Sequence, residues 1–243
     1  LMLWGGAFGF TLQVYCDFSA YSDMAVGIGR AFNIKLPENF RNPYLARSIT
    51  EFWQRWHISL STWLRDYLYI PLGGSRKGPG RTYFNLLITM FLGGLWHGAA
   101  LTYVVWGGLH GLLLAAERFF RIGTDMHDEN RGGLIGVVRG IMTVSLHAAG
   151  LVIFRAADLP TAWHYLARMM TAWEIHGDER LAIAWIGALV LLCTGQFLIE
   201  RHRIDRPCWI ELPAFAQGIA LAAILYMTAW FQADKVAFIY FQF

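Results

Sequence analysis

Residues 84–100 read FNLLITMFLGGLWHGAA, an apolar stretch that contains three glycines and a single histidine. An apolar helix of about 20 residues is long enough to cross a hydrocarbon core roughly 30 Å thick. Gly93, Gly94 and Gly98 predict that this stretch bends or breaks before the next apolar window begins. Backbone groups freed at membrane depth must be satisfied by protein or by a water-filled cavity. The stretch therefore predicts a membrane protein with irregular, protein-lined backbone around His97.

Long apolar windows lie on both sides of this stretch. Of the 243 residues, 56% are hydrophobic and only 15% charged, against roughly 25% charged in soluble domains, which excludes disorder, coiled coil and collagen. The opening window, Leu3–Phe32, carries Asp17 and Asp23, which must face protein or lie beyond the membrane edge. We expect an all-α, polytopic transmembrane helix bundle, with further spans over Leu101–Phe120, Leu134–Phe154, Leu181–Ile199 and Phe215–Phe231.

Residues 33–82 differ from the sequence on either side. Prolines and glycines divide them into short pieces, and the stretch from Arg30 to Arg81 holds nine Lys or Arg against three Asp or Glu, a net charge of +6. Ser48–Leu64 is predicted to form an amphipathic helix, with Ser48 as N-cap and Glu51 in the capping-box position. Because basic residues concentrate on the cytoplasmic side, we expect residues 33–82 to face the cytoplasm. Ordinary positive-inside topology together with contact with lipid headgroups is sufficient to explain this charge.

Three histidines are the candidates for chemistry. His97 lies between glycines, His110 follows in the next apolar window, and His57 lies in the tryptophan-rich amphipathic segment. A neutral imidazole can take a proton from a hydroxyl nucleophile, which contributes about 10² to 10⁴ in rate. A hydrogen-bonded structural histidine explains each position as well. We expect no metal, because close ligand spacing and an acidic partner are lacking, and no serine-nucleophile motif accompanies the histidines.

Five sequence motifs follow one another between Tyr15 and Gly98: Tyr15–Ala25, Asn39–Tyr44, Phe52–Ser61, Arg65–Gly74 and Gly94–Gly98. Together they strongly resemble the membrane-bound O-acyltransferase family, in the branch that contains the membrane subunit of alginate O-acetylation and the D-alanyl transferase of teichoic acids. Phe238–Phe243 are similar to the C-terminal end of the alginate-type branch.

The resemblance implies a role for each candidate residue. His97 would be the catalytic general base, and His57 the second polar residue of the active site, which orients or polarises the donor carbonyl. The resemblance also implies re-entrant segments around a central funnel. Weaker candidates for lining the substrate channel or supporting the site are Trp96, Arg55, Arg65, Asp66, Tyr67, Tyr69 and His110.

The implied reaction moves an acetyl group from a cytoplasmic donor, acetyl-CoA or another acyl thioester, toward an exported, alginate-like polysaccharide. No bound cofactor and no nucleic acid are expected. The expected partners are the lipid bilayer, an extracytoplasmic acetyl-transfer protein and the polysaccharide acceptor, and the expected location is the bacterial inner membrane, crossed several times. Residues 1–243 would form one membrane domain, the C-terminal part of a longer chain that also carries the family's first membrane helices.

Three other functions stay open at this point. The same fold could transfer D-alanine from a carrier protein to teichoic acid. The same histidines could relay protons in a transporter or channel, which composition alone favours as strongly as acyl transfer. The chain could also be a noncatalytic membrane scaffold. The density of matching motifs favours acyl transfer over all three.

Overall fold

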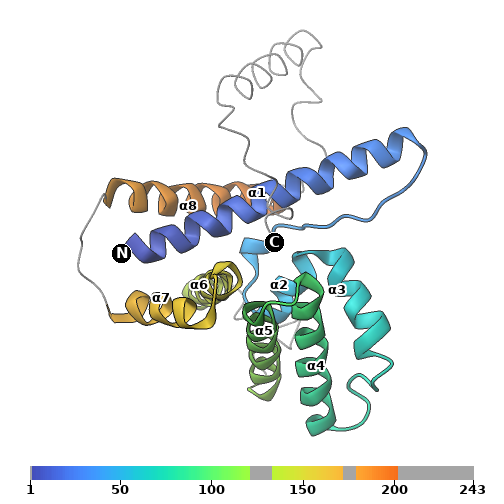
Figure 1. The fold of residues 1–243 in the computed structure, drawn as a ribbon. Coiled ribbons are helices and arrows are strands. Elements are labelled where there is room, and N and C mark those ends of the chain that lie inside the picture. The colour runs from blue at the N-terminus through green and yellow to red at the C-terminus, as the bar shows by residue number, and fades with distance from the viewer. Residues whose placement is uncertain (1, 121–132, 172–178, 202–243) are drawn as a thin grey trace. The chain divides into compact units, whose positions relative to one another are not determined.

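The computed structural model describes residues 2–120, 133–171 and 179–201 (Figure 1). The chain forms two compact units, Leu1–Cys193 and Thr194–Phe243, and the described part of the second unit is the end of one helix. All regular structure within the described ranges is helical, which confirms the all-α prediction for them.

The helices fall into a long and a short group. The long helices are α1 (Met2–Ala31), α4 (Pro79–His97), α5 (Leu101–Phe119), α6 (Gly133–Arg155), α7 (Leu159–Thr171) and α8 (Glu179–Arg201). The short elements between α1 and α4 are the 3₁₀ helix η1 (Pro43–Leu45), α2 (Ile49–Arg55), α3 (Ile58–Leu64) and the π-helix η2 (Arg65–Tyr69).

The amphipathic helix predicted over Ser48–Leu64 is in fact two helices, α2 and α3. Its start is as predicted, because Ser48 Oγ accepts a hydrogen bond from the Glu51 N–H at 3.0 Å. The chain leaves the helical conformation at Trp56, which is extended, and at His57, where φ is 45° and ψ is 53°. This left-handed residue changes the direction of the chain and places the imidazole between two short helices.

Of the three glycines predicted to bend or break residues 84–100, only Gly98 interrupts the helix. α4 continues through Gly93 and Gly94 and ends at His97, so the break lies at Gly98. A β-carbon on Gly94 would overlap the Tyr103 carbonyl oxygen, and one on Gly107 would overlap that of Met90. These glycines therefore allow the backbones of α4 and α5 to approach closely, which a larger side chain would prevent.

One helix in the described ranges, α6, is long and apolar enough to cross a membrane, with a mean hydropathy of 1.8 over its best window. Helices also form over the predicted windows Leu101–Phe120 and Leu181–Ile199, but they do not meet the same criterion. The predicted span Phe215–Phe231 lies outside the described residues. A bundle with several transmembrane helices therefore stays a prediction.

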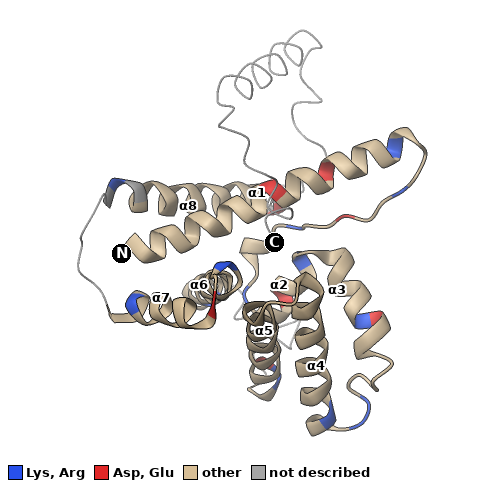
Figure 2. Cartoon of the chain, in the orientation of Figure 1, with Lys and Arg blue, Asp and Glu red and all other residues tan. Residues whose placement is uncertain are grey.

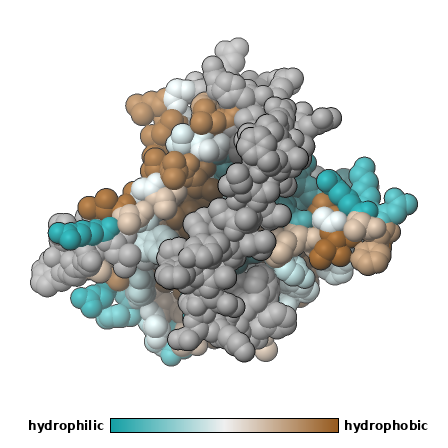
Figure 3. Space-filling model, turned by 90° about the horizontal axis from the view of Figure 1, so that it is seen from above, coloured by the Kyte–Doolittle hydropathy of each residue, from teal (hydrophilic) through white to brown (hydrophobic). Residues whose placement is uncertain are grey.

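The surface of the long helices is largely apolar. α6 exposes Leu134, Val137 and Ile141 along one side, and Figure 3 shows hydrophobic side chains at the surface of the face viewed there. Charged residues are few in α4. Its basic residue, Arg81, lies at the start of the helix, whereas His97 is at the end (Figure 2). This distribution suits a protein whose helices contact lipid or further apolar protein.

The core that positions the site is built around the short helix α2, which packs against α5 (Figure 1). Phe52, Trp53 and Trp56 are buried there. On the other side, Tyr44 of η1 donates its O–H to the Thr11 carbonyl oxygen of α1 at 2.9 Å. Because aromatic side chains bury large apolar areas, this cluster fixes a helix that is too short to be stable alone.

Candidate active site

His97 occupies the last position of α4 and lies among aromatic rings from three helices. Its ring is perpendicular to that of Trp106, with centroids 5.3 Å apart, and lies 5.1 Å from the ring of Phe154. The residue keeps partial exposure. His97 is therefore held by packing against these rings.

Gly98 is required at the turn that follows His97. Its φ is 153°, and a β-carbon there would lie 2.8 Å from the ring of Tyr103. Tyr103 belongs to the first turn of α5 and in turn packs on Phe154, with ring centroids 4.7 Å apart. The glycine thus lets the α4–α5 turn close tightly around the imidazole.

His57 is fixed by a strained turn that Asn39 holds in place. The Asn39 carbonyl oxygen accepts from the Ile58 N–H at 3.0 Å, and its side-chain Oδ1 accepts from the Ser59 N–H at 3.2 Å and from the Ser59 hydroxyl at 3.0 Å. Asn39 Nδ2 also donates to Ser22 Oγ at 3.1 Å, which connects the turn to α1. A non-glycine residue in left-handed backbone is uncommon, and such strain concentrates at functional sites.

The His57 ring is buried against aromatic neighbours. It lies edge-on to Phe18 with centroids 4.7 Å apart. Burial lowers the pKa of His57 below its ordinary value, and the nearby His97 lowers it further. His57 lies between two short helices and not in a membrane-length one. The lowered pKa therefore follows from burial within the protein, and the ring is neutral near pH 7.

Trp96 connects the two histidines. Its ring centroid is 6.1 Å from that of His57 and 5.0 Å from that of His97. The indole is 57% exposed, so one side of it remains open. The structure thus brings His57, Trp96 and His97, which come from two separate motifs, into one neighbourhood.

His110 lies deeper in the core. Its Nδ1 accepts a hydrogen bond from Trp53 Nε1 at 3.3 Å, and its ring packs on Trp106. The residue is fully buried. Trp106 thus packs against both His110 and His97, and His110 lies on the core side of that indole.

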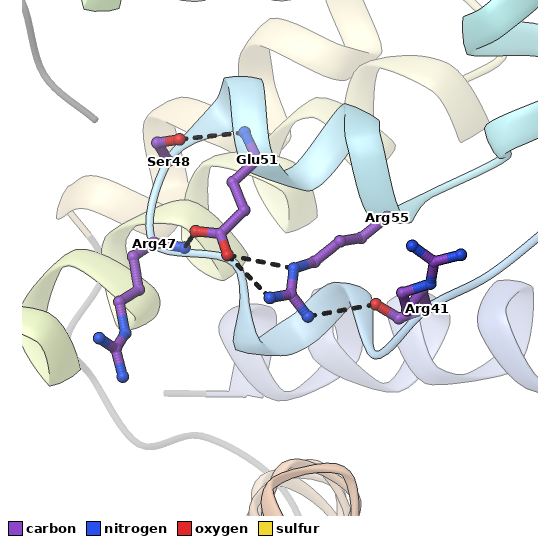
Figure 4. Close-up of polar contacts among 5 residues, drawn as sticks. All are labelled: Arg41, Arg47, Ser48, Glu51 and Arg55. Carbon is purple, nitrogen blue, oxygen red and sulfur yellow. Dashed lines mark hydrogen bonds and ion pairs between the residues drawn. The ribbon is translucent and has the colours of Figure 1, made fainter. Parts of the chain in front are cut away.

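Arg55 takes part in a network that organises α2 (Figure 4). Its guanidinium bonds Glu51 Oε1, with Nη2 at 2.9 Å, and donates to the Arg41 carbonyl oxygen at 3.4 Å. The other Glu51 oxygen accepts a hydrogen bond from the Arg47 N–H at 2.9 Å. In an ordinary capping box this bond would come from the N–H of the N-cap residue, Ser48, so here the donor is the residue before it. Through these described contacts, Arg55 holds the chain segments that precede α2 close to the helix.

The candidates on the π-helix η2 make their described contacts with one another and with nearby residues of the chain. Arg65 and Asp66 form an exposed ion pair with each other, with Nε and Oδ1 2.7 Å apart, and Tyr67 packs on the exposed Trp63. Tyr69 is half-buried and accepts at its carbonyl oxygen from the Gly74 N–H. No hydrogen bond or ring contact within the described ranges joins these four residues to His57 or His97, and their role at the site stays a prediction.

Asn39 and His147 contact the residues around the site but were not among the predicted site residues. Asn39 holds the His57 turn, and His147 of α6 lies buried with its ring centroid 4.2 Å from that of Phe52. His147 interrupts the apolar window of α6, and this unexplained polar residue was the signal available in the sequence. In the described part of the chain, no three His, Cys, Asp or Glu side chains are grouped closely enough to hold a metal ion.

Comparison with known proteins identifies the family. The model of the membrane-bound O-acyltransferase family matches residues 1–150, which include both histidines and the α4–α5 hairpin. The chain belongs to the membrane-bound O-acyltransferase family. The resemblance inferred from the five motifs is thereby confirmed.

Members of the membrane-bound O-acyltransferase family that are similar to this chain modify different polymers. A probable alginate O-acetylase of Pseudomonas putida is 52% identical over 179 residues, which are 74% of this chain and 35% of that protein. A peptidoglycan O-acetyltransferase of Helicobacter pylori is 41% identical over 170 residues, 70% of this chain and 32% of that protein. A teichoic acid D-alanyltransferase of Bacillus subtilis is 34% identical over 123 residues, 46% of this chain and 30% of that protein. The chain thus spans about a third of the length of the curated relatives it matches.

Proposed function

We propose that this chain carries the reaction centre of a membrane O-acetyltransferase, which moves an acetyl group from a cytoplasmic thioester toward an exported, alginate-like polysaccharide. The observation that carries the proposal is the shared neighbourhood of His57 and His97 around Trp96. The names of the relatives that match over most of this chain support O-acetylation of a polysaccharide.

The chemistry assigns one histidine to the acceptor and the other to the donor. His97 takes the proton from the attacking hydroxyl as the new C–O bond forms and the thioester C–S bond breaks. The proton then passes from His97 to the leaving thiolate. His57, neutral because burial lowers its pKa, donates its ring N–H to the donor carbonyl oxygen, where negative charge develops.

The charge of residues 33–82 suits the donor side. An acyl thioester with phosphate groups, such as acetyl-CoA, or a carrier with an acidic surface would be attracted to this basic region. We place it at the cytoplasmic face of a multi-pass protein in the bacterial inner membrane. An extracytoplasmic acetyl-transfer protein would accept the group and deliver it to the polysaccharide. Transfer of D-alanine to teichoic acid is less favoured, because those relatives match a shorter part of the chain at lower identity.

Substitution of His97 tests the proposal. In cells that produce the whole protein, His97→Ala should lower the acetate content of the exported polysaccharide at least about a hundredfold, because the general base is lost. The matched control is His164→Ala on α7, an exposed histidine outside the site, which should leave acetylation unchanged. Normal acetylation by His97→Ala, at equal amounts of protein in the membrane, would refute the proposal.

A further inference from the structure

The first turn of α3 is capped by a residue that is distant in the sequence. His57 is the N-cap residue of α3, and its side chain makes no hydrogen bond to the N–H groups of that helix. The first N–H groups of a helix lack partners within it, and the N-cap side chain usually accepts from one of them. Here the Asn39 carbonyl oxygen accepts from the Ile58 N–H at 3.0 Å, and Asn39 Oδ1 accepts from the Ser59 N–H at 3.2 Å. Asn39 therefore caps α3 in place of residue 57.

The hydrogen bonds of the Asn39 side chain fix the orientation of its amide. The Ser59 N–H can only donate, so the Asn39 atom that faces it is the acceptor Oδ1. Nδ2 then faces α1, where it donates to Ser22 Oγ at 3.1 Å. Ser22 is buried in α1. The same side chain thus caps α3 and anchors the cap to α1.

Backbone hydrogen bonds of the segment that begins at Asn39 enclose the His57 turn. The Arg41 N–H donates to the Arg55 carbonyl oxygen at 2.9 Å, and the Ile58 N–H donates to the Asn39 carbonyl oxygen at 3.0 Å. Arg55 precedes His57 in the chain and Ile58 follows it. The two bonds therefore hold the backbone on both sides of His57.

The imidazole of His57 is not needed at the helix terminus, because Asn39 caps it. A side chain that caps its own helix is directed at the N–H groups of the first turn. The His57 ring instead lies edge-on to Phe18, with centroids 4.7 Å apart, and 6.1 Å from the ring of Trp96. The Trp96 ring also contacts that of His97. The cap from Asn39 therefore accompanies a His57 ring that lies in the neighbourhood of His97.

We propose that Asn39 is a positioning residue for acetyl transfer, which caps α3 in place of residue 57 and thereby sets the position of the His57 imidazole. Asn39 touches no reacting atom and acts only through His57. Stabilisation of the charge on the donor carbonyl depends on where the His57 N–H lies, so a displaced ring slows the chemical step. This effect on the rate rests on the proposed function of His57, whereas the cap does not.

Substitutions in the whole protein in its membrane test the positioning role. Asn39→Ala should lower kcat for acetyl transfer roughly tenfold and leave KM for the donor unchanged, because the bond from His57 strengthens only as charge develops. Asn39→Asp keeps an acceptor for the Ser59 N–H, and the Ser22 hydroxyl can donate to its second oxygen, so it should keep most of the rate. Ser22→Ala removes only the anchor and should lower kcat less than Asn39→Ala does.

A His57→Ala background separates positioning from a general loss of structure. Because Asn39 acts only through His57, Asn39→Ala should slow the His57→Ala protein no further, and Ser22→Ala replaces it in this cycle if Asn39→Ala does not fold. Asp158→Ala is the matched control, since Asp158 Oδ1 caps α7 by accepting from the Thr161 N–H at 2.8 Å, and it should leave kcat unchanged. Losses that multiply in the double variant, or an Asn39→Asp protein as slow as Asn39→Ala, would overturn the positioning role.

Hydrogen exchange of the whole protein in detergent tests the cap itself, without acetyl transfer. Peptides that contain the Ser59 N–H should take up deuterium faster in Asn39→Ala than in the wild type, because that N–H loses its acceptor. Peptides from α7 should exchange equally in both proteins. Equal uptake at Ser59 would overturn the cap. If the wild-type protein transfers no acetyl group but the difference at Ser59 is present, the proposed function fails and the cap stands.

Discussion

His57 occupies left-handed backbone, which costs a non-glycine residue about 1 to 3 kcal/mol unless its surroundings hold it there. Those surroundings are the hydrogen bonds that Asn39 makes to Ile58 and Ser59. The sequence around Ser48 and Glu51 was sufficient to predict where α2 begins. It was not sufficient to predict where α2 ends, because no glycine or proline marks the turn at His57 and the bonds that stabilise it come from residue 39.

The pH dependence of stability should reveal the buried state of His57. Folding lowers its pKa from the ordinary value of 6.5, so the folded state favours the neutral ring. The resulting contribution to stability is complete above pH 6.5 and is lost as the pH falls from there toward the folded-state pKa. His57→Asn removes this proton uptake, and asparagine tolerates left-handed backbone.

The measurement compares the two proteins in detergent by chemical unfolding between pH 7 and pH 5. Below pH 6.5 the free energy of unfolding should fall for the wild type by about 1.4 kcal/mol per pH unit more than for His57→Asn. This difference isolates His57 from the other buried histidines, which both proteins share. Equal slopes would show that His57 is not buried as a neutral ring.

Helix α2 is held at its start by a residue far away in the sequence. The Glu117 carboxylate, from the last turn of α5, accepts from the Ile49 N–H, and from the Thr50 N–H and Thr50 hydroxyl at 2.9 Å each. A carboxylate at a helix N-terminus satisfies free N–H groups and favours the helix dipole. The sequence marks Glu117 only as a charge at the end of an apolar window, since long-range partners have no local pattern.

Removal of the Glu117 carboxylate should destabilise α2. We expect Glu117→Ala to lower the free energy of unfolding by about 1 to 2 kcal/mol, the range for a helix cap with charge-assisted bonds. Glu117→Gln should lose less, because it keeps one acceptor oxygen. Thermal or chemical unfolding of the purified protein measures both.

Glu38→Ala is the control for this substitution. Glu38 and Arg41 form an ion pair whose side chains are 53% and 65% exposed, so its loss should change stability by less than about 0.5 kcal/mol. A loss for Glu117→Ala no greater than that of the control would show that the Glu117 contact does not stabilise α2.

In the molecule as a whole, the sequence predicted the helical class and the family, because apolar windows and ordered motifs are local patterns. It did not distinguish Gly98, where α4 ends, from Gly94, which packs closely against α5, because a glycine can serve either a bend or a close approach of two backbones. The sequence did not predict which residues contact each other across helices. His147 is the clearest case, because its neighbours Phe52 and His110 come from two other helices.

The claim on which this account depends is that His57 and His97, forty positions apart, act on one acetyl group in one site. Acetyl-transfer rates of the wild-type protein, His57→Ala, His97→Ala and the double variant form the cycle that tests it. Residues that act as a unit lose activity together, so the double variant should be about as slow as His97→Ala alone. Losses that multiply in the double variant, to the product of the two single effects, would contradict a shared site.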